Sequence, residues 1–224
     1  MLWTLPPSPL DYRPPVLAPK AAVVSQAMAS SPSVQRPAKP EAPAPTKAVQ
    51  TTKTVRIHGT NDGEAAAKVA LLRDQVVKPA LGDGPRGMAN TRALLAEALG
   101  GAPKGANGHN KSAEAVRIFE WVRSRVRYVN DPTGRELFQQ LPELMKDGIG
   151  DCEDFTGLLT ALFTAAGIQV KARIIQIPRK RGWAHIYPVA LLAGKWRAFD
   201  ATENNRPGWE YPQATKSMDL EVMP

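Results

Sequence analysis

Cys152 is the only cysteine among 224 residues, and it follows a Gly-x-Gly turn at the start of an apolar run with helical spacing, Leu158 to Ala166. A thiol at this position lies close to the first amide groups of a helix, which have no partner within the helix. These N–H groups and the helix dipole favour the thiolate, so we expect the pKa of the thiol to be lowered. Cys152 is therefore a candidate nucleophile.

A cysteine nucleophile needs a base, and the base needs a group that orients it. The chain has three histidines. His58 and His109 lie in Gly-flanked turns before the cysteine, and we interpret both as surface residues. His185 lies inside an expected strand, and Asp200 ends the next one. Adjacent antiparallel strands can place these two side chains side by side, on the face against which the Cys152 helix packs.

Each of these residues also has a purely structural interpretation. A lone cysteine on an apolar helix is often buried filler, and a carboxylate at a strand end often caps a turn. A single strand histidine is likewise weak support for catalysis. The combination favours the catalytic interpretation, because the thiol begins a helix after Gly-x-Gly and His185 and Asp200 follow on consecutive strands.

The surrounding pattern predicts helices first and strands afterwards. Apolar residues at helical spacing predict helices at about 65–77, 90–99, 112–126 and 136–145. Pro79 ends the first, Asn90 or Thr91 caps the second, Ser112 caps the third, and Gly167 closes the Cys152 helix. Alternation then predicts strands at 170–177, 184–191 and 195–199. Short connections imply an antiparallel meander, so the predicted fold class is α+β.

The chain divides into four segments. They are an extended Pro/Ala-rich arm at 1–50, a helical lead-in at 51–111 that opens with a short strand or extended link at 51–59, a core at 112–203 and a C-terminal surface tail at 204–224. The arm holds eleven of the 21 prolines. Such a segment cannot bury enough apolar surface to offset its ordering entropy, so we expect protein partners to order it.

Composition and charge argue against several classes of function. The formal charge is +8, and residues 1–60 carry +5 of it, from seven Lys/Arg and two Asp/Glu. The globular part therefore gives little support for nucleic-acid binding. A single cysteine excludes an intrachain disulfide, and no Cys/His spacing matches a zinc site, so we expect no metal and no cofactor. No apolar run is long enough to span a membrane, and we identify no Sec-type signal peptide.

Three short motifs resemble those of the transglutaminase-like superfamily. Gly150-Asp-Cys-Glu-Asp, followed by a helix ending in Ala-Ala-Gly-Ile, resembles its nucleophile motif. His185 and Phe199-Asp200-Ala-Thr resemble the second and third motifs, although the third is usually Asp-Pro-Thr. Upstream, the stretch from Trp121 to Pro132 resembles the lead-in of bacterial and bacteriophage members. The resemblance covers about residues 112–203.

This resemblance implies a papain-like α+β core with a catalytic triad of Cys152, His185 and Asp200. Cys152 would attack an amide carbonyl, His185 would pair with the thiolate and protonate the leaving amine, and Asp200 would fix the imidazole. The backbone N–H of Cys152 would supply one oxyanion donor, and calcium is not implied. For the second oxyanion donor three residues stay open, namely Tyr128, Gln139 and Gln140.

Three functions remain open at this point. The first is a cysteine hydrolase, that is a peptidase, isopeptidase or amidase, and the second is an amine-transferring transglutaminase. The third is a catalytically silent docking module anchored by its arm. Because members with this lead-in occur among tailed-bacteriophage genes, we expect a virion component, in the tail, made in the host cytoplasm. Its partners would be other virion proteins, and its substrate a peptide or peptidoglycan.

Overall fold

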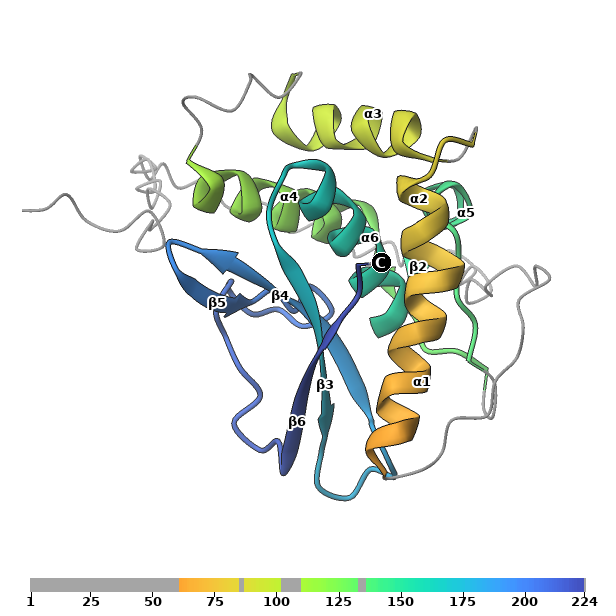
Figure 1. Cartoon of the computed structure of the whole chain (residues 1–224), viewed down its shortest axis with the longest axis vertical. Coiled ribbons are helices and arrows are strands. Elements are labelled where there is room, and N and C mark those ends of the chain that lie inside the picture. Colours follow the sequence, from red (N-terminus) through yellow and green to blue (C-terminus); the bar gives the residue numbers. More distant parts are fainter. Residues whose placement is uncertain (1–60, 85–86, 102–109, 133–135, 224) are drawn as a thin grey trace, which may run out of the picture. The chain divides into compact units, whose positions relative to one another are not determined.

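The computed structural model describes residues 61–223, apart from 85–86, 102–109 and 133–135 (Figure 1). All the described residues belong to one compact unit. The predicted arm, the predicted strand at 51–59 and both His58 and His109 lie outside the described residues.

The first described helices follow one another without a break. They are α1 (Asp62–Leu72), the π-helix η2 (Arg73–Val77) and α2 (Lys78–Leu81). The sequence predicted that Pro79 would end this segment, but helix continues to Leu81. In η2 the amide of Lys78 donates to Arg73 O, five residues back, so the turn before the proline is wide. A wide turn tolerates the missing proline N–H better than a regular α-helical turn does.

Four more helices follow. They are α3 (Met88–Leu99), α4 (Lys111–Arg125), α5 (Leu141–Asp147) and α6 (Cys152–Ala165). Gly167, with φ of +71°, follows the end of α6, as the sequence predicted. In α5 the proline lies in the first turn, where its missing N–H leaves no bond unmade, so the helix starts later than predicted.

Two helix caps differ from the predicted ones. Asn110, rather than Ser112, caps α4, because its Oδ1 accepts the amide of Ser112 at 3.1 Å. Gly87 begins α3, and Thr91 has another role: its hydroxyl donates to Ala80 O at 2.6 Å and so joins α3 to α2. Both cases show side-chain hydrogen bonds that helical spacing alone does not specify.

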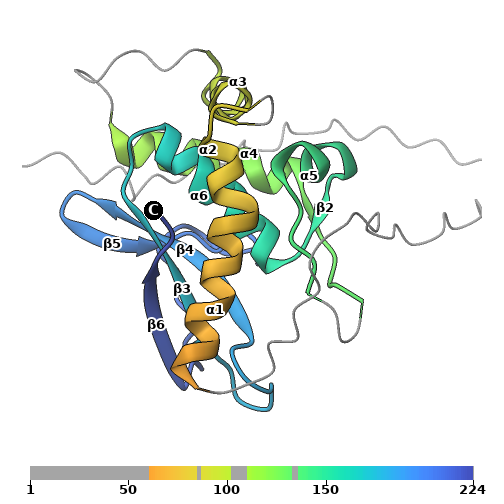
Figure 2. The ribbon, with the colours of Figure 1, turned by 45° about the vertical axis from the view of Figure 1, so that its right-hand side comes forward.

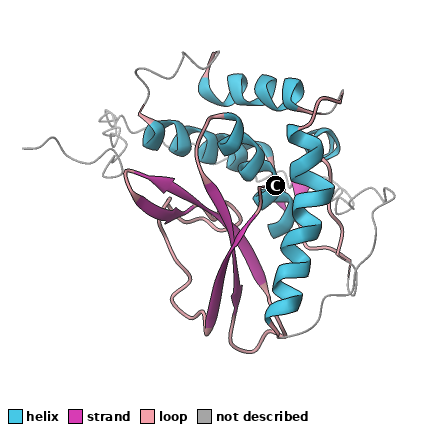
Figure 3. Cartoon of the chain, in the orientation of Figure 1, coloured by secondary structure: helices cyan, strands magenta, loops and turns pink. Residues whose placement is uncertain are grey.

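Four strands form an antiparallel sheet in the order β5-β4-β3-β6 (Figure 3). They are β3 (Val170–Gln176), β4 (His185–Leu192), β5 (Lys195–Ala198) and β6 (Lys216–Glu221). The α+β class and the three predicted strands are confirmed. β6 lies within the range expected to be a surface tail, where it pairs antiparallel with β3.

Helix α6 is the centre of this arrangement, since every residue from Cys152 to Phe163 is buried. One of its sides packs on β3 and β4, and η2, α2, α3 and α4 cover the others (Figures 1 and 2). Gly157 permits the closest approach: a Cβ there would lie 2.6 Å from Val76 Cγ1 and 3.3 Å from Leu72 Cδ1. The glycine therefore lets the first helices lie directly against α6.

Within the described residues, no helix combines the length and the apolar character that crossing a bilayer requires.

Candidate active site

Cys152 is the first residue of α6, and a short parallel ladder holds the chain that leads to it. β1 (Arg127–Tyr128) pairs with β2 (Ile149–Gly150), and the amide of Val129 donates to Gly150 O at 2.9 Å. The glycine at 150 is required by packing, because a Cβ there would lie 2.8 Å from Asp154 Cβ. The Gly-x-Gly turn of the motif thus fits between the ladder and the helix start.

Asp154, the last residue of the motif, is a structural anchor. It is fully buried, and its carboxylate accepts the backbone amide of Asp151 at 3.2 Å, which forms part of a capping box at the start of α6. The same carboxylate accepts the backbone amide of Gln139 at 2.9 Å and its Nε2 at 3.1 Å. Asp154 therefore fixes the residue before Cys152 and the segment that leads into α5.

His185 and Asp200 lie beside each other, as the strand spacing indicated. His185 is the first residue of β4, and Asp200 follows β5, where Phe199 N still donates to Pro188 O at 2.9 Å. His185 Nε2 is 2.7 Å from Asp200 Oδ2, and both residues are buried. The other carboxylate oxygen accepts the amide and the hydroxyl of Thr202, at 3.1 and 2.6 Å. Asp200 is thus held in place and orients the imidazole.

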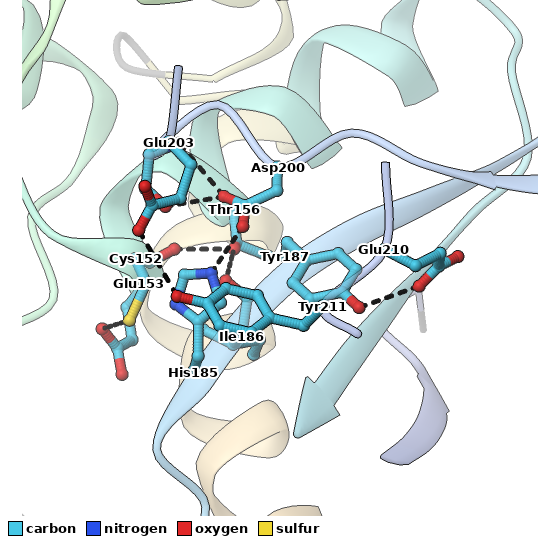
Figure 4. A network of polar contacts seen from close by, with 11 residues as sticks. Cys152, Glu153, Thr156, His185, Ile186, Tyr187, Asp200, Glu203, Glu210 and Tyr211 are labelled. Carbon is cyan, nitrogen blue, oxygen red and sulfur yellow. Dashed lines mark hydrogen bonds and ion pairs between the residues drawn. The ribbon is translucent and has the colours of Figure 1, made fainter. Parts of the chain in front are cut away.

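Thr156 joins the start of α6 to the start of β4. Its Oγ1 lies 2.6 Å from Cys152 O and 3.1 Å from Ile186 O, so its single proton is shared between the two carbonyls. Figure 4 shows the result, with the imidazole of His185 between the Cys152 side chain and Asp200. Because Asp200 takes Nε2, Nδ1 is the ring nitrogen left for the sulfur.

The thiol itself has another partner in this structure. Cys152 Sγ donates to Glu153 Oε2 at 3.0 Å, and this hydrogen bond points away from His185 (Figure 4). Burial first, and then the Glu153 charge, hold the pKa of the Cys152 thiol well above its usual value, with Lys68 acting in the opposite direction. The helix start alone predicted a lowered pKa. That prediction is wrong for this state, because desolvation and a neighbouring carboxylate outweigh the helix dipole.

Two tyrosines enclose the imidazole. The ring of Tyr187 and that of Tyr211 each lie 5.6 Å from the ring of His185 (Figure 4). Glu210 accepts the Tyr187 hydroxyl at 3.0 Å and pairs with Arg173 at 2.7 Å, so the segment after Asp200 is fastened to the sheet. The rings leave His185 only 7% exposed. Asp200 keeps a pKa below its usual value although burial opposes this, because His185 hydrogen bonds to it.

One candidate oxyanion donor is occupied elsewhere. Both hydrogen bonds from Gln139 Nε2 are used, one to Ile149 O at 3.0 Å and one to Asp154. Tyr128 is 39% exposed, and its ring lies 6.4 Å from that of Phe155. Sequence reasoning did not find Glu153, Thr156 or Tyr211 as neighbours of the site. Glu153 stood within the motif, but nothing in the spacing indicated that its side chain would accept the thiol.

Residues 102–201 match the family model of the transglutaminase-like superfamily. This segment includes Cys152, His185 and Asp200, with the helix and strands that carry them. This segment is therefore similar to the transglutaminase-like superfamily. No curated protein matches the sequence.

Solved structures with a similar fold come from several bacteria. A candidate protease from Parabacteroides distasonis aligns over 70% of this chain and 31% of its own, with 16% identity and a TM-score of 0.48. A candidate cysteine protease from Cytophaga hutchinsonii aligns over 74% and 57%, with 16% identity and a TM-score of 0.41. Legionella pneumophila LapG aligns over 68% and 84%, with 18% identity and a TM-score of 0.40. The chain thus spans less than two thirds of the first two proteins.

Proposed function

We propose that the chain is a cysteine hydrolase that cleaves a peptide, isopeptide or amide bond through Cys152, His185 and Asp200. The observation that carries this proposal is the buried pair of His185 and Asp200, joined at 2.7 Å next to a cysteine that begins a helix. A buried histidine oriented by a carboxylate is the partner that a cysteine nucleophile requires. The match of residues 102–201 to the transglutaminase-like superfamily supports the same chemistry.

The proposed reaction has two steps. His185 Nδ1 takes the thiol proton, and the Cys152 thiolate forms a C–S bond to the carbonyl carbon while the C–N bond breaks. The departing amine takes the proton from His185. Water then attacks the thioester, gives one proton to His185 and releases the acid, and Cys152 recovers its proton. Asp200 keeps Nε2 protonated throughout, so that Nδ1 faces the sulfur.

Developing negative charge on the carbonyl oxygen needs hydrogen-bond donors. The backbone N–H of Cys152 is the first donor we propose, because it belongs to the first turn of α6 and needs no intrahelical partner. Of the other candidates, Gln139 directs its amide group at β2 and Asp154 instead.

Alkylation by iodoacetamide near pH 7 tests the thiol–imidazole pair. Replacing His185 by alanine should slow modification of Cys152 about tenfold or more, because the thiolate loses its partner. A matched control is Tyr187→Phe, which keeps the ring beside His185 and removes only a hydroxyl that bonds Glu210. Equal rates in the native protein and His185→Ala would overturn the hydrolase proposal.

Transfer to an amine is the second candidate, and the superfamily match favours it equally. Hydrolysis predicts cleavage of peptide or peptidoglycan substrates without incorporation of a labelled primary amine. Incorporation of that amine into a glutamine-containing protein would support the transferase instead. In both assays Cys152→Ala should be inactive.

We also propose that the Pro-rich arm at 1–50 docks the domain onto another protein, in the setting of a bacteriophage virion. The composition of the arm supports docking, since eleven prolines in fifty residues disfavour a core of its own. Deleting 1–50 should abolish assembly and leave the domain that follows folded. Normal assembly of the shortened chain would remove both the docking role and the silent-module alternative.

A further inference from the structure

A second charged cluster lies behind Cys152, on the side away from His185. Glu153 Oε2 accepts the thiol at 3.0 Å, and the other oxygen pairs with Lys68 Nζ of α1. The side chains of Lys68 and Glu153 are only 5% and 4% exposed. A second carboxylate, Glu136, lies 3.3 Å from Lys68 Nζ. Cys152 therefore lies between two buried pairs, Lys68–Glu153 and His185–Asp200. In this structure its thiol bonds to the first pair.

Stability alone is a poor reason for this ion pair. Desolvating two charges costs several kcal/mol each, and apolar replacements of buried pairs are often neutral or stabilising. Lys68 also lies outside residues 102–201, which match the superfamily. The pair thus adds a charge from the lead-in helix to the back of the candidate active site.

The packing of α1 on α6 explains how Lys68 reaches this place. Leu72 and Val76 lie on Gly157, where a side chain would collide with them. Lys68 precedes Leu72 by one turn, and Glu153 precedes Gly157 by one turn, so the same contact brings the two charges together. Gly157 therefore sets the distance between Lys68 and the thiol.

The two partners of the thiol have opposite effects on its proton. An ionised carboxylate can only accept, so the bond to Glu153 needs Cys152 in its neutral form. His185 Nδ1, by contrast, can take the proton and remain as a cation beside the thiolate. Lys68 keeps Glu153 ionised: although burial opposes it, the pairing lowers the pKa of that carboxyl.

We propose that Glu153, held by Lys68, is a positioning residue that keeps Cys152 as a resting thiol turned away from His185. Catalysis begins when this hydrogen bond is released and the sulfur turns to Nδ1. The inference rests on the proposed hydrolase function and assigns to its site a built-in resting state. The charged groups that act on the thiol are Glu153, Lys68 and Asp151, and the imidazole of His185, paired with Asp200, lies away from the Glu153 bond (Figure 4).

The pH profile of Cys152 alkylation by iodoacetamide tests this proposal. In Glu153→Gln the carboxylate charge is gone while the shape is kept, so modification at pH 7 should be at least about tenfold faster, with the profile moved at least about one pH unit lower. The matched control is Glu114→Gln, which removes the same charge from a Lys–Glu pair at the opposite end of α6. It should leave the profile unchanged.

Combining Glu153→Gln with His185→Ala distinguishes this inference from the proposed function. Adding His185→Ala to Glu153→Gln should remove most of the gained reactivity, because the released thiol pairs with His185. If His185→Ala slows the native protein but Glu153→Gln is no faster than it, the resting-thiol proposal is overturned and the hydrolase proposal stands. If Glu153→Gln is faster and His185→Ala changes neither protein, the hydrolase proposal is overturned instead.

Folding is controlled with a neutral version of the pair. Lys68→Met with Glu153→Gln removes both charges of the enclosed pair and leaves only Glu136, whose side chain is 23% exposed, so it should fold even where a single variant does not. It should alkylate faster than the native protein. A folded double variant with native or slower alkylation would overturn the proposal.

Discussion

A Lys–Glu ion pair lies near each end of α6, and the two pairs differ in their surroundings. Beyond the last turn, Lys111 of α4 donates to Glu114 at 2.9 Å and to Ala166 O at 2.6 Å; the Lys111 side chain is 42% exposed and that of Glu114 is 9% exposed. At the first turn, the side chains of Lys68 and Glu153 are almost fully enclosed. The pair of Lys111 and Glu114 places a cation at the C-terminal end of α6, where the helix dipole favours it. The pair of Lys68 and Glu153 lies against the thiol of Cys152.

The two pairs differ in what their charges can do: one adds to the stability of the fold, and the other also acts on the candidate active site. An exposed pair adds up to about 1 kcal/mol and is screened by water. A buried pair is strongly coupled to its neighbours, so it controls the protonation of whatever it contacts. At the first turn of α6 that neighbour is Cys152.

Removing one partner should have unequal effects at the two ends. Lys68→Met leaves Glu153 buried without its cation, and we expect a loss of about 3–5 kcal/mol in the free energy of unfolding. Lys111→Met should lose less, because the Lys111 side chain is 42% exposed and water screens its charge. Urea unfolding followed by circular dichroism measures both. Equal losses would show that the two pairs are equivalent supports.

Filling the contact at Gly157 should disturb the first turn without changing any charge. In Gly157→Ala the new Cβ collides with Val76, and overpacking of this kind costs about 1–3 kcal/mol. Val76→Ala makes room, so the double variant should be more stable than the sum of the two single losses predicts. Denaturant midpoints decide the question, and strictly additive losses would contradict the close packing of η2 on α6.

Glu136, the other carboxylate close to Lys68, should make the free energy of unfolding depend on pH. Burial first, and then the Glu153 charge, raise the pKa of Glu136 to about 7 from 4.5. The folded state therefore binds more protons than the unfolded state between these values, and stability falls as pH rises through this window. Glu136→Gln should be about 1–2 kcal/mol more stable than the native protein at about pH 8, after allowance for its partial exposure.

At about pH 4 the same variant should match the native protein, since Glu136 is then neutral in both states. Thermal melts at the two pH values provide the measurement. A gain that persists at the acidic pH would mean that the substitution acts through packing and that the charge of Glu136 has no part in it.

The smallest effect is expected when both charges of the buried pair are removed. The free energy of unfolding of Lys68→Met with Glu153→Gln should lie within about 1 kcal/mol of the native value, because neither partner of the pair is left without its counter-charge. Comparison with the losses of Lys68→Met and of Glu153→Gln alone gives the coupling energy of the pair. A double variant as unstable as Lys68→Met would show that the helices themselves depend on this ion pair.

The sequence predicted the α+β fold and the order of its elements well. Helical and alternating periods report local preferences, and the strands at 170–177, 184–191 and 195–199 lie close to β3, β4 and β5. β6 escaped prediction because it is isolated among Pro, Gly and charged residues, and its pairing with β3 is a contact between distant segments. The spacing of apolar residues did not predict the π-helix η2 before Pro79 either.

The candidate site was predicted only in part, for a similar reason. The pairing of His185 with Asp200 follows from strand parity and is present at 2.7 Å. Glu153, which accepts the Cys152 thiol, pairs with a lysine 84 positions before the cysteine, counting from 68 to 152, where the first helices pack on Gly157. No local pattern contains that information. The assignment of Cys152, His185 and Asp200 to catalysis stays a prediction.

Acylation of Cys152 by p-nitrophenyl acetate tests the central claim most directly. The activated ester needs no recognition, so mass spectrometry of the peptide that contains residue 152 reports nucleophilic attack itself. We predict a burst of p-nitrophenol with an acetyl group on Cys152 that is later hydrolysed, and a much smaller burst in His185→Ala. No acetyl group on Cys152, or equal bursts in the two proteins, would contradict a cysteine nucleophile activated by His185.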